Sequence, residues 1–528
     1  MDEKKELSLE KLLAAFESAW YQSTEYYRDK VSDELAEQGA LLAWMMREQE
    51  EDVRKEIVEW VEAKVEEKRP IITIYLYSIC LNICPCPVYV EKIINVITKN
   101  KEQFTKNNLY FYAYQLFGVT FRNPEADTIE VKLAIWKLFR EVYTLFKQEV
   151  TTSLERIPVG ERNEKLIIVI AEQFLETSHG PTKTALDRCR AIMTKMNKEV
   201  FLICSNEVLP SLGKMPFCDQ RIGVVCESNV EKEEIEWKGI KVPFFCIEEE
   251  MPDIQVINGI LEIIRNMAPS KVVCIGGMGV LMNLVDYIVP CIDIGLCPSD
   301  LEPTIASYQT LGRSMSQKEE VLLQGMELEK THVIESVFTS SLKPQEGHVT
   351  REKLGIPQDS FVIAVIGGRL YDEVDSDFLN MLNASWEDDY FVLFLGKFDS
   401  IDSRLENYDK INASYTLMMV DDILAVLEVC NLYVNPIRKG GGTSSVEAMY
   451  KGIPVVTTNF GDVSVNAGED FWVCNYTEMG KQIHRYYSEQ EFYVRQSEIA
   501  RRRAEILLDT ESELVRIMEE YDKRELLN

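Results

Sequence analysis

A glycine-rich turn near the C-terminal end of the chain has the composition of a phosphate site. The apolar segment NLYVN is followed by Gly440, Gly441, Gly442, Thr443 and Ser444, and then by the helical pattern SSVEAMYKG. Glycines let the backbone approach a ligand closely, and the free N–H groups at a helix start attract anions. The segment therefore predicts a phosphate-binding turn between a strand and a helix, although a ligand-free helix start has the same composition.

Two basic and two acidic residues are expected to contact a ligand bound at this turn. Arg369, next to Gly368, lies near the end of the segment FVIAVIGGRL, and Lys397 lies near the end of the segment FVLFLGKF. Because the carboxyl ends of parallel strands meet at one edge of a sheet, both cations are expected to face the same cleft. Glu447 lies one turn into the helix, where its side chain points toward a ribose beside the phosphate. Asp462, after the next strand, is expected to contact sugar hydroxyls.

Other phosphate-binding motifs do not fit this sequence. No Lys-Ser/Thr follows the glycines at the spacing of a P-loop, and no G-x-G-x-x-G opens an expected strand. The segment GGMG at 276–279 has the wrong spacing for a dinucleotide fingerprint, and we interpret it as a cleft-facing turn.

His179 is the candidate general base. It lies in the loop ETSHGPTKT, directly after the first strand of the first α/β region, and histidine titrates in the working pH range. Glu176 and Lys183 in the same loop are rival candidates, and an ordinary loop histidine is the alternative interpretation.

No metal and no cofactor is predicted beyond the donor substrate. Cys80, Cys84 and Cys86 lie close together, but no second cysteine pair or nearby histidine completes a zinc site. Asp375 and Asp377 form a D-x-D sequence at an expected helix start, where carboxylates are favoured without a metal.

Composition narrows the class of protein. The 528-residue chain has a formal net charge of −30, which disfavours nucleic acid as a partner, and 46% hydrophobic residues, enough for several cores. It has no uninterrupted apolar run of membrane-spanning length and no secretory pattern at its N-terminus. With 13 scattered cysteines, these features predict a cytoplasmic protein with reduced thiols.

The order of apolar patterns predicts an α/β fold class with two tandem Rossmann-like domains behind an all-helical N-terminal domain. The expected units are residues 1–155, helical; 165–345, the acceptor-side domain; 350–485, the donor-nucleotide domain; and 486–528, C-terminal helices. Ligands of such sheets bind at the carboxyl ends of the strands, so the cleft between the domains is the expected site.

The segment NPIRKGGGTSSVEAMYKGIPVV resembles the donor site of GT-B glycosyltransferases, close to the family 4 pattern. The resemblance covers residues 355–510 and implies that Arg369 and Lys397 clamp the donor diphosphate. It also implies that residues 416–420, with Met418 among them, line the base pocket. Family 4 has a glutamate eight residues before Glu447, and this chain has Lys439 there. The sugar and the stereochemistry therefore stay open.

A second resemblance, to family 41, rests on a Gly/Thr-rich phosphate turn that lacks this glutamate and on the helical N-terminus. It implies UDP-sugar donors and inversion. The predicted function is therefore transfer of a hexosyl or N-acetylhexosaminyl group from a nucleotide-sugar to a protein or glycan. The donor is expected to be UDP-linked, and no metal ion is expected to take part. A homo-oligomer is compatible with this prediction. The alternative is an inactive GT-B partner or chaperone of another glycosyltransferase, and an epimerase of the same fold is a third hypothesis.

Overall fold

The computed structural model describes residues 8–26, 29–47, 49–177, 179–223, 225–398, 401–411, 415–417, 420 and 422–526. Helices make up the N-terminal part of the chain. They are α1 (Leu9–Tyr26), α2 (Asp33–Met46), α3 (Glu51–Glu62), α4 (Pro70–Ile83), α5 (Pro87–Lys99), α6 (Lys106–Arg122) and α7 (Ile129–Lys147). Local sequence sets several of the helix starts: the side chain of Thr128, for example, accepts a hydrogen bond from the Val131 amide and so caps α7.

A first α/β domain follows the helices. Its elements are β1 (Asn163–Ala171), α8 (Gly180–Thr194), β2 (Glu199–Cys204), α9 (Glu227–Val230), β3 (Glu234–Trp237), β4 (Ile240–Cys246), α10 (Ile254–Met267), β5 (Pro269–Ile275), α11 (Val280–Val285), β6 (Cys291–Ile294), β7 (Tyr308–Leu311), α12 (Gln317–Gly325) and β8 (Val333–Glu335). Within the described residues the eight-stranded sheet has the order β3-β4-β2-β1-β5-β6-β7-β8. Strand β3 runs antiparallel to β4, and the central strand β1 runs parallel to β2 and β5.

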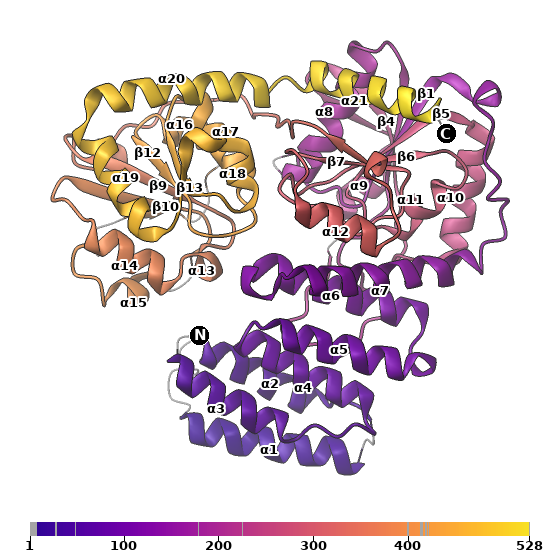
Figure 1. Cartoon of the computed structure of the whole chain (residues 1–528), viewed down its shortest axis with the longest axis horizontal. Helices are drawn as coiled ribbons and strands as arrows, with labels where there is room; N and C mark the ends of the chain where they lie inside the picture. The colour runs from indigo at the N-terminus through magenta and orange to yellow at the C-terminus, as the bar shows by residue number, and fades with distance from the viewer. Residues whose placement is uncertain are drawn as a thin grey trace.

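The helical region and this sheet share a hydrophobic core. Tyr110 and Phe111 of α6 and Phe139 of α7 belong to the same buried cluster as Ile168 of β1 and Val272 of β5. The amphipathic face of α6 and α7 is therefore buried against the sheet, while a separate cluster fills the bundle of α1 to α4. Figure 1 shows α6 and α7 between that bundle and the sheet.

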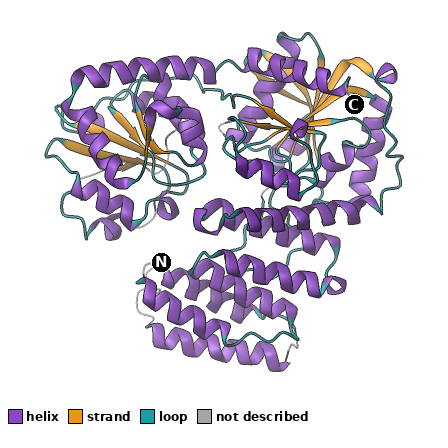
Figure 2. Cartoon of the chain, in the orientation of Figure 1, coloured by secondary structure: helices purple, strands orange, loops and turns teal. Residues whose placement is uncertain are grey.

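A second α/β domain contains the glycine-rich turn. Its elements are β9 (Phe361–Ile366), α13 (Leu370–Glu373), α14 (Ser376–Ala384), β10 (Tyr390–Leu395), α15 (Ile401–Leu405), β11 (Tyr415–Leu417), α16 (Ile423–Leu427), β12 (Leu432–Val434), α17 (Gly442–Tyr450), β13 (Val455–Thr458), α18 (Gly461–Ala467), β14 (Trp472–Val473) and α19 (Tyr476–Ser488). Across the described residues six parallel strands form a sheet in the order β11-β10-β9-β12-β13-β14. Figure 2 shows helices on both faces of this sheet.

The last two helices belong to different domains. Helix α20 (Gln490–Leu507) runs along the second α/β domain, and α21 (Thr510–Glu525) lies on the first (Figure 1). The Tyr521 hydroxyl donates to the Pro290 carbonyl at 2.8 Å, and Glu525 forms an ion pair with Arg162 at 2.7 Å. The C-terminal end of the chain therefore ties the two α/β domains together.

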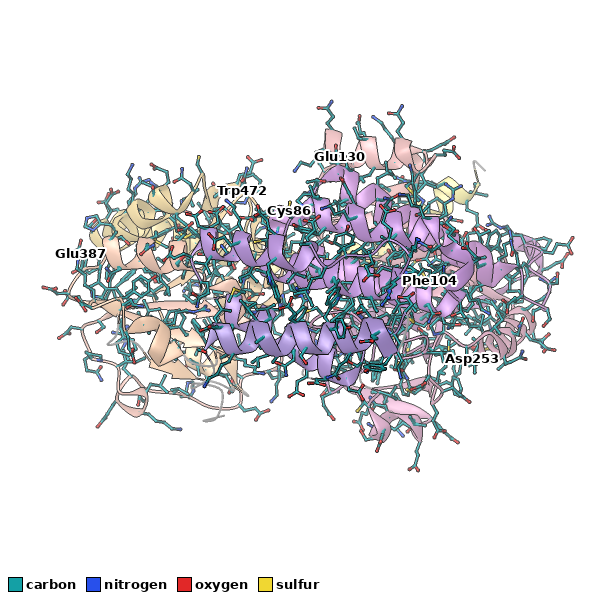
Figure 3. The ribbon with its side chains drawn as sticks, turned by 90° about the horizontal axis from the view of Figure 1, so that it is seen from below. Cys86, Phe104, Glu130, Asp253, Glu387 and Trp472 are labelled. Carbon is teal, nitrogen blue, oxygen red and sulfur yellow. The ribbon has the colours of Figure 1, made fainter. Side chains whose placement is uncertain are left out.

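The predicted fold class is confirmed: two Rossmann-like domains follow an all-helical region. Figure 3, seen from below, shows Cys86 and Phe104 in the helical region and Glu387 at the outer end of the second α/β domain. Within the described residues no helix combines the length and the apolar character that a bilayer crossing needs.

Candidate donor and acceptor site

The glycine-rich turn joins β12 to α17, as its sequence predicts. Gly441 is the N-cap of α17, with φ at 94°, a left-handed conformation that favours glycine, and no side chain caps the first turn of the helix. A Cβ atom at Gly441 would lie 2.5 Å from Arg438 Nη2, and one at Gly442 would lie 2.8 Å from Asn466 Nδ2. Glycine is therefore required by conformation and by space, and the helix start is available to an anion.

The Arg438 side chain lies against this turn, and the sequence did not indicate a role for it. Its side chain is only 4% exposed. The guanidinium donates to Asn435 Oδ1 at 2.8 Å, to Glu373 Oε2 at 2.5 Å, to the Ile366 carbonyl at 2.5 Å and to the Tyr433 hydroxyl at 3.0 Å. A buried cation with these partners fixes the ends of β9 and β12 relative to each other.

Arg369 lies beside the turn, where the sequence places it. A Cβ atom at Gly440 would lie 3.2 Å from Arg369 Nη2. The guanidinium binds Glu373 Oε1 at 2.8 Å and lies 5.5 Å from the centre of the Phe121 ring in α6. With 41% of its side chain exposed, Arg369 is open to a ligand. Its role as a diphosphate clamp stays a prediction.

The other donor-side candidates follow the neighbouring strand β10. Lys397 and Gly368 are exposed residues of the loops after β10 and β9. These loops are in contact, because a Cβ atom at Gly396 would lie 1.9 Å from the Gly367 carbonyl oxygen. Met418 lies outside the described residues, so the predicted base pocket is not described.

The first turn of α17 is held by side-chain hydroxyls. The Ser444 hydroxyl donates to the Gly441 carbonyl at 2.8 Å and lies 3.0 Å from the Tyr433 hydroxyl. It does not cap the helix, because its bond is to a carbonyl group. Thr443 is half-buried beside it.

Lys183 of the first α/β domain acts electrostatically on His179 in its own domain and on Glu447 in the second α/β domain. His179 is the N-cap of α8, and Lys183 is buried in the first turns of the same helix. Burial lowers the pKa of His179, and the charge of Lys183 lowers it further. Burial raises the pKa of Glu447 in α17 to about 7, against the opposing effect of Lys183. The charge of one lysine therefore affects both the candidate base and the candidate ribose ligand.

Asp462 is bound to the opposite domain. Its Oδ1 accepts from the Ser299 hydroxyl at 2.6 Å and from the Ser299 amide at 3.2 Å. Burial raises the pKa of Asp462 to about 7, although these bonds and the charge of Lys439 oppose the effect. A contact with sugar hydroxyls stays a prediction for this residue.

The GGMG segment is held by buried carboxyl groups. Glu302 Oε2 accepts from the Gly277 amide at 2.6 Å, Glu207 Oε1 accepts from the Leu281 amide at 3.0 Å, and Glu172 accepts from the Gly279 amide. Burial is the main cause that raises the pKa of Glu172 to about 8 and that of Glu207 to about 7. The turn at the carboxyl ends of β1, β2, β5 and β6 is thus rigidly supported.

A cavity of about 740 Å³ opens beside this turn, at the carboxyl ends of β1, β2 and β4. Glu172, Gln173 and Asn206 line it together with the acidic run 248–250. Its volume is that of a small-molecule or side-chain pocket. Among the described residues no group of three or more His, Cys, Asp or Glu side chains is arranged to hold a metal ion.

Two facing Rossmann-like domains, the second with a glycine-rich and uncapped helix start, define the class as the GT-B fold. Residues 349–503 match the model of the family described as Glycosyl transferases group 1. The second α/β domain is therefore similar to the group 1 glycosyltransferases, in a protein of GT-B fold. No curated protein matches the chain significantly.

Several solved structures are similar to this chain at low sequence identity. A glycosyltransferase from Rickettsia africae ESF-5 is 12% identical, with a TM-score of 0.51 over 68% of this chain and 98% of that one. An O-GlcNAc transferase mutant from Thermobaculum terrenum is 12% identical, with a TM-score of 0.49 over 97% and 94% of the two chains. Sucrose-phosphate synthase from Thermosynechococcus elongatus is 13% identical, with a TM-score of 0.48 over 69% and 100%.

Proposed function

We propose that this protein transfers a hexosyl or N-acetylhexosaminyl group from a nucleotide-sugar to a protein or glycan acceptor. The observation that carries the proposal is the uncapped start of α17, where Gly441 has φ at 94° above the buried guanidinium of Arg438. The backbone amides and the positive end of the helix dipole bind the donor diphosphate. UDP-sugars are the first donors to test, because the family 41 resemblance implies them.

The donor side stabilises the leaving group. Arg369 and Lys397 offer positive charge at the ends of the adjacent strands β9 and β10. Negative charge grows on the diphosphate as the bond to the sugar breaks, so fixed cations lower the barrier. We propose that these cations and the helix start act without a metal ion, and that no cofactor is needed beyond the donor.

The acceptor side supplies a base. His179 is held at the start of α8 with a lowered pKa, so its imidazole is neutral and able to accept the acceptor proton at neutral pH. Its Nδ1 lies 3.4 Å from the Thr182 hydroxyl, a contact that orients the ring. Direct attack assisted by this base inverts the anomeric carbon. The cavity at the carboxyl ends of β1, β2 and β4 is the proposed acceptor pocket.

We also propose that the protein works in the cytoplasm. All thirteen of its cysteines lie within the described residues, and all are free thiols. A reducing compartment preserves this state. A homo-oligomer is compatible with the proposal and is tested by light scattering.

The experiment is a release assay for nucleoside diphosphate over a panel of nucleotide-sugars, with and without protein or glycan acceptors, each in the presence and absence of EDTA. Lys397→Ala is expected to abolish turnover. Lys481→Ala is the matched control, since this exposed lysine of α19 pairs only with Glu478 on the same helix in the contacts described. Full activity of the Lys397 variant rejects the proposed donor site, and loss of activity in EDTA rejects metal independence.

A second candidate function is that of a non-catalytic GT-B partner of another glycosyltransferase. Lys439 favours it, because this lysine stands where family 4 has a glutamate, and its ammonium is bound by two aspartates. Under this alternative no donor is turned over, and Lys397→Ala leaves partner binding intact.

A further inference from the structure

Lys439 is a buried residue that directly precedes the glycine-rich turn. Its side chain is 8% exposed, and its Nζ lies 2.6 Å from Asp127 Oδ2 and 3.2 Å from Asp300 Oδ2. Asp127 precedes α7 in the helical region, and Asp300 lies in the loop between β6 and β7 of the first α/β domain. One side chain of the donor turn is therefore bound by two other parts of the chain.

Lys132 completes a cluster of two cations and two carboxylates. Its Nζ lies 3.2 Å from Asp127 Oδ2 and also contacts Asp300 Oδ2. Burial alone raises the pKa of Asp300, but the charges of Lys132 and Lys439 lower it to about 2. The same two aspartates raise the pKa of Lys439, so Lys439 and Asp300 form a charged pair at neutral pH.

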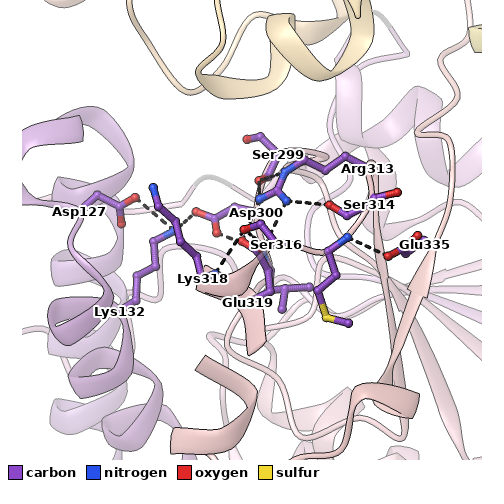
Figure 4. A network of polar contacts seen from close by, with 12 residues as sticks. Asp127, Lys132, Ser299, Asp300, Arg313, Ser314, Ser316, Lys318, Glu319 and Glu335 are labelled. Carbon is purple, nitrogen blue, oxygen red and sulfur yellow. Dashed lines mark hydrogen bonds and ion pairs between the residues drawn. The ribbon is translucent and has the colours of Figure 1, made fainter. Parts of the chain in front are cut away.

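The loop that carries Asp300 is itself held in place. Arg313 donates to the Ser299 carbonyl from Nε at 3.2 Å and from Nη2 at 2.9 Å, and it forms an ion pair with Glu319 at 2.8 Å. Figure 4 shows these residues beside the Asp127–Lys132–Asp300 contacts. Ser299 in turn donates to Asp462 of the donor domain. Two adjacent residues of one loop thus bind Lys439, directly before the glycine-rich turn, and Asp462, which lies beside Gly442.

We propose that Lys439 is a positioning residue: its bonds to Asp127 and Asp300 hold the glycine-rich turn in its anion-binding conformation. An ammonium shared by two carboxylates adds little net charge to the donor site, so its effect is exerted through the backbone of Gly440 to Gly442. Family 4 has a sugar-contacting glutamate at this position. Here Lys439 instead connects the second α/β domain to the helical region and to the first α/β domain. This inference rests on the proposed function of the turn.

The first test is hydrogen exchange of the full chain without donor. Lys439→Met and Asp127→Asn are each expected to speed exchange of the amides at 440–444 at least tenfold, although Asp127 lies in the helical region. Lys481→Met is the matched control on the same domain and leaves these amides unchanged. Because no donor is present, the result does not depend on the proposed activity.

The second test is a charge reversal read by calorimetry with UDP-sugars. Lys439→Glu places three carboxylates together and is expected to weaken donor binding at least tenfold. Adding Asp300→Lys restores an ion pair, and the double variant is expected to recover most of the lost affinity. Lys439→Arg keeps the charge and is expected to stay within threefold of the parent protein.

Three outcomes overturn the inference. The first is unchanged exchange at 440–444 in both Lys439→Met and Asp127→Asn. The second is a double variant, Lys439→Glu with Asp300→Lys, whose donor affinity is no higher than that of Lys439→Glu alone. The third is weaker donor binding with unchanged exchange in the free protein, which marks Lys439 as a direct donor ligand. If the parent protein binds no nucleotide-sugar, the proposed function fails, and the exchange experiment still decides the role of Lys439.

Discussion

Arg369 and Glu373 form an ion pair beside the glycine-rich turn, with Arg369 Nη2 2.8 Å from Glu373 Oε1. The other carboxylate oxygen, Oε2, binds the buried guanidinium of Arg438 at 2.5 Å. One carboxylate therefore orients the exposed cation beside the turn and neutralises the buried cation under it. Under the proposed function, this residue links donor binding to the stability of the second α/β domain.

Glu373→Ala is expected to lower the free energy of unfolding by about 3–5 kcal/mol, because it leaves the buried charge of Arg438 without its counter-charge. Donor affinity falls as well, since Arg369 loses its orienting partner. Urea unfolding measures the first effect and calorimetry the second. Glu428→Ala, which removes the exposed contacts of this carboxylate with Lys451 and His348, is the control and is expected to cost much less. An equal cost for the two variants contradicts the structural role of Glu373.

Gly441→Ala is expected to disrupt the turn. The new Cβ would lie 2.5 Å from Arg438 Nη2, and the φ of 94° adds strain of about 1–2 kcal/mol. We expect at least a tenfold loss of donor affinity by calorimetry. Gly259→Ala in the middle of α10 meets no atom within 4 Å and is expected to raise stability by about 0.5–1 kcal/mol with donor affinity unchanged. Parent-like donor binding in the Gly441 variant rules out this turn as the phosphate site.

The pH dependence of kcat/KM is expected to report His179. Burial and the charge of Lys183 lower its pKa below the usual 6.5, so the neutral base persists to lower pH. Activity should fall as the pH falls through this lowered value. Lys183→Met removes a cause of the shift and moves the acidic limb upward, and His179→Ala lowers kcat about 10²–10⁴-fold. An unmoved acidic limb in both variants excludes His179 as the base.

Buried carboxyl groups in the first α/β domain are expected to reduce stability as the pH rises. The pKa of Glu172 is about 8 in the folded chain, raised chiefly by burial from 4.5, so the folded state binds more protons between these values. Its stabilising contribution is complete below about pH 4.5, is lost as the pH rises to about 8, and amounts to roughly 3–5 kcal/mol. Glu172→Gln stays neutral, so its melting temperature relative to the parent protein should increase from pH 5 to pH 8. A constant difference over this range contradicts the assigned pKa.

The sequence predicts the elements around the donor turn well, because their signals are local. NLYVN and the helix pattern after Ser444 correspond to β12 and α17, and three consecutive glycines leave few alternatives for the connection. Asp375 caps α14, as a carboxylate at a helix start should: its side chain accepts from the Phe378 amide.

Contacts between distant segments could not be predicted in this way. Arg438 sits next to a glycine run, a position typical of an exposed residue, and only the packing of β9 against β12 buries it. The apolar stripe of α7 predicts an amphipathic helix without indicating which surface it covers. Likewise, nothing in the residues around Lys439 indicates that Asp127 and Asp300 bind it.

The most direct test is calorimetric titration of the full chain with UDP, GDP and a panel of nucleotide-sugars in EDTA, alongside Gly441→Ala. We predict a one-to-one complex with at least one of these ligands and at least tenfold weaker binding in the variant. Absence of a binding heat for every ligand, or equal affinities for the parent protein and Gly441→Ala, contradicts it.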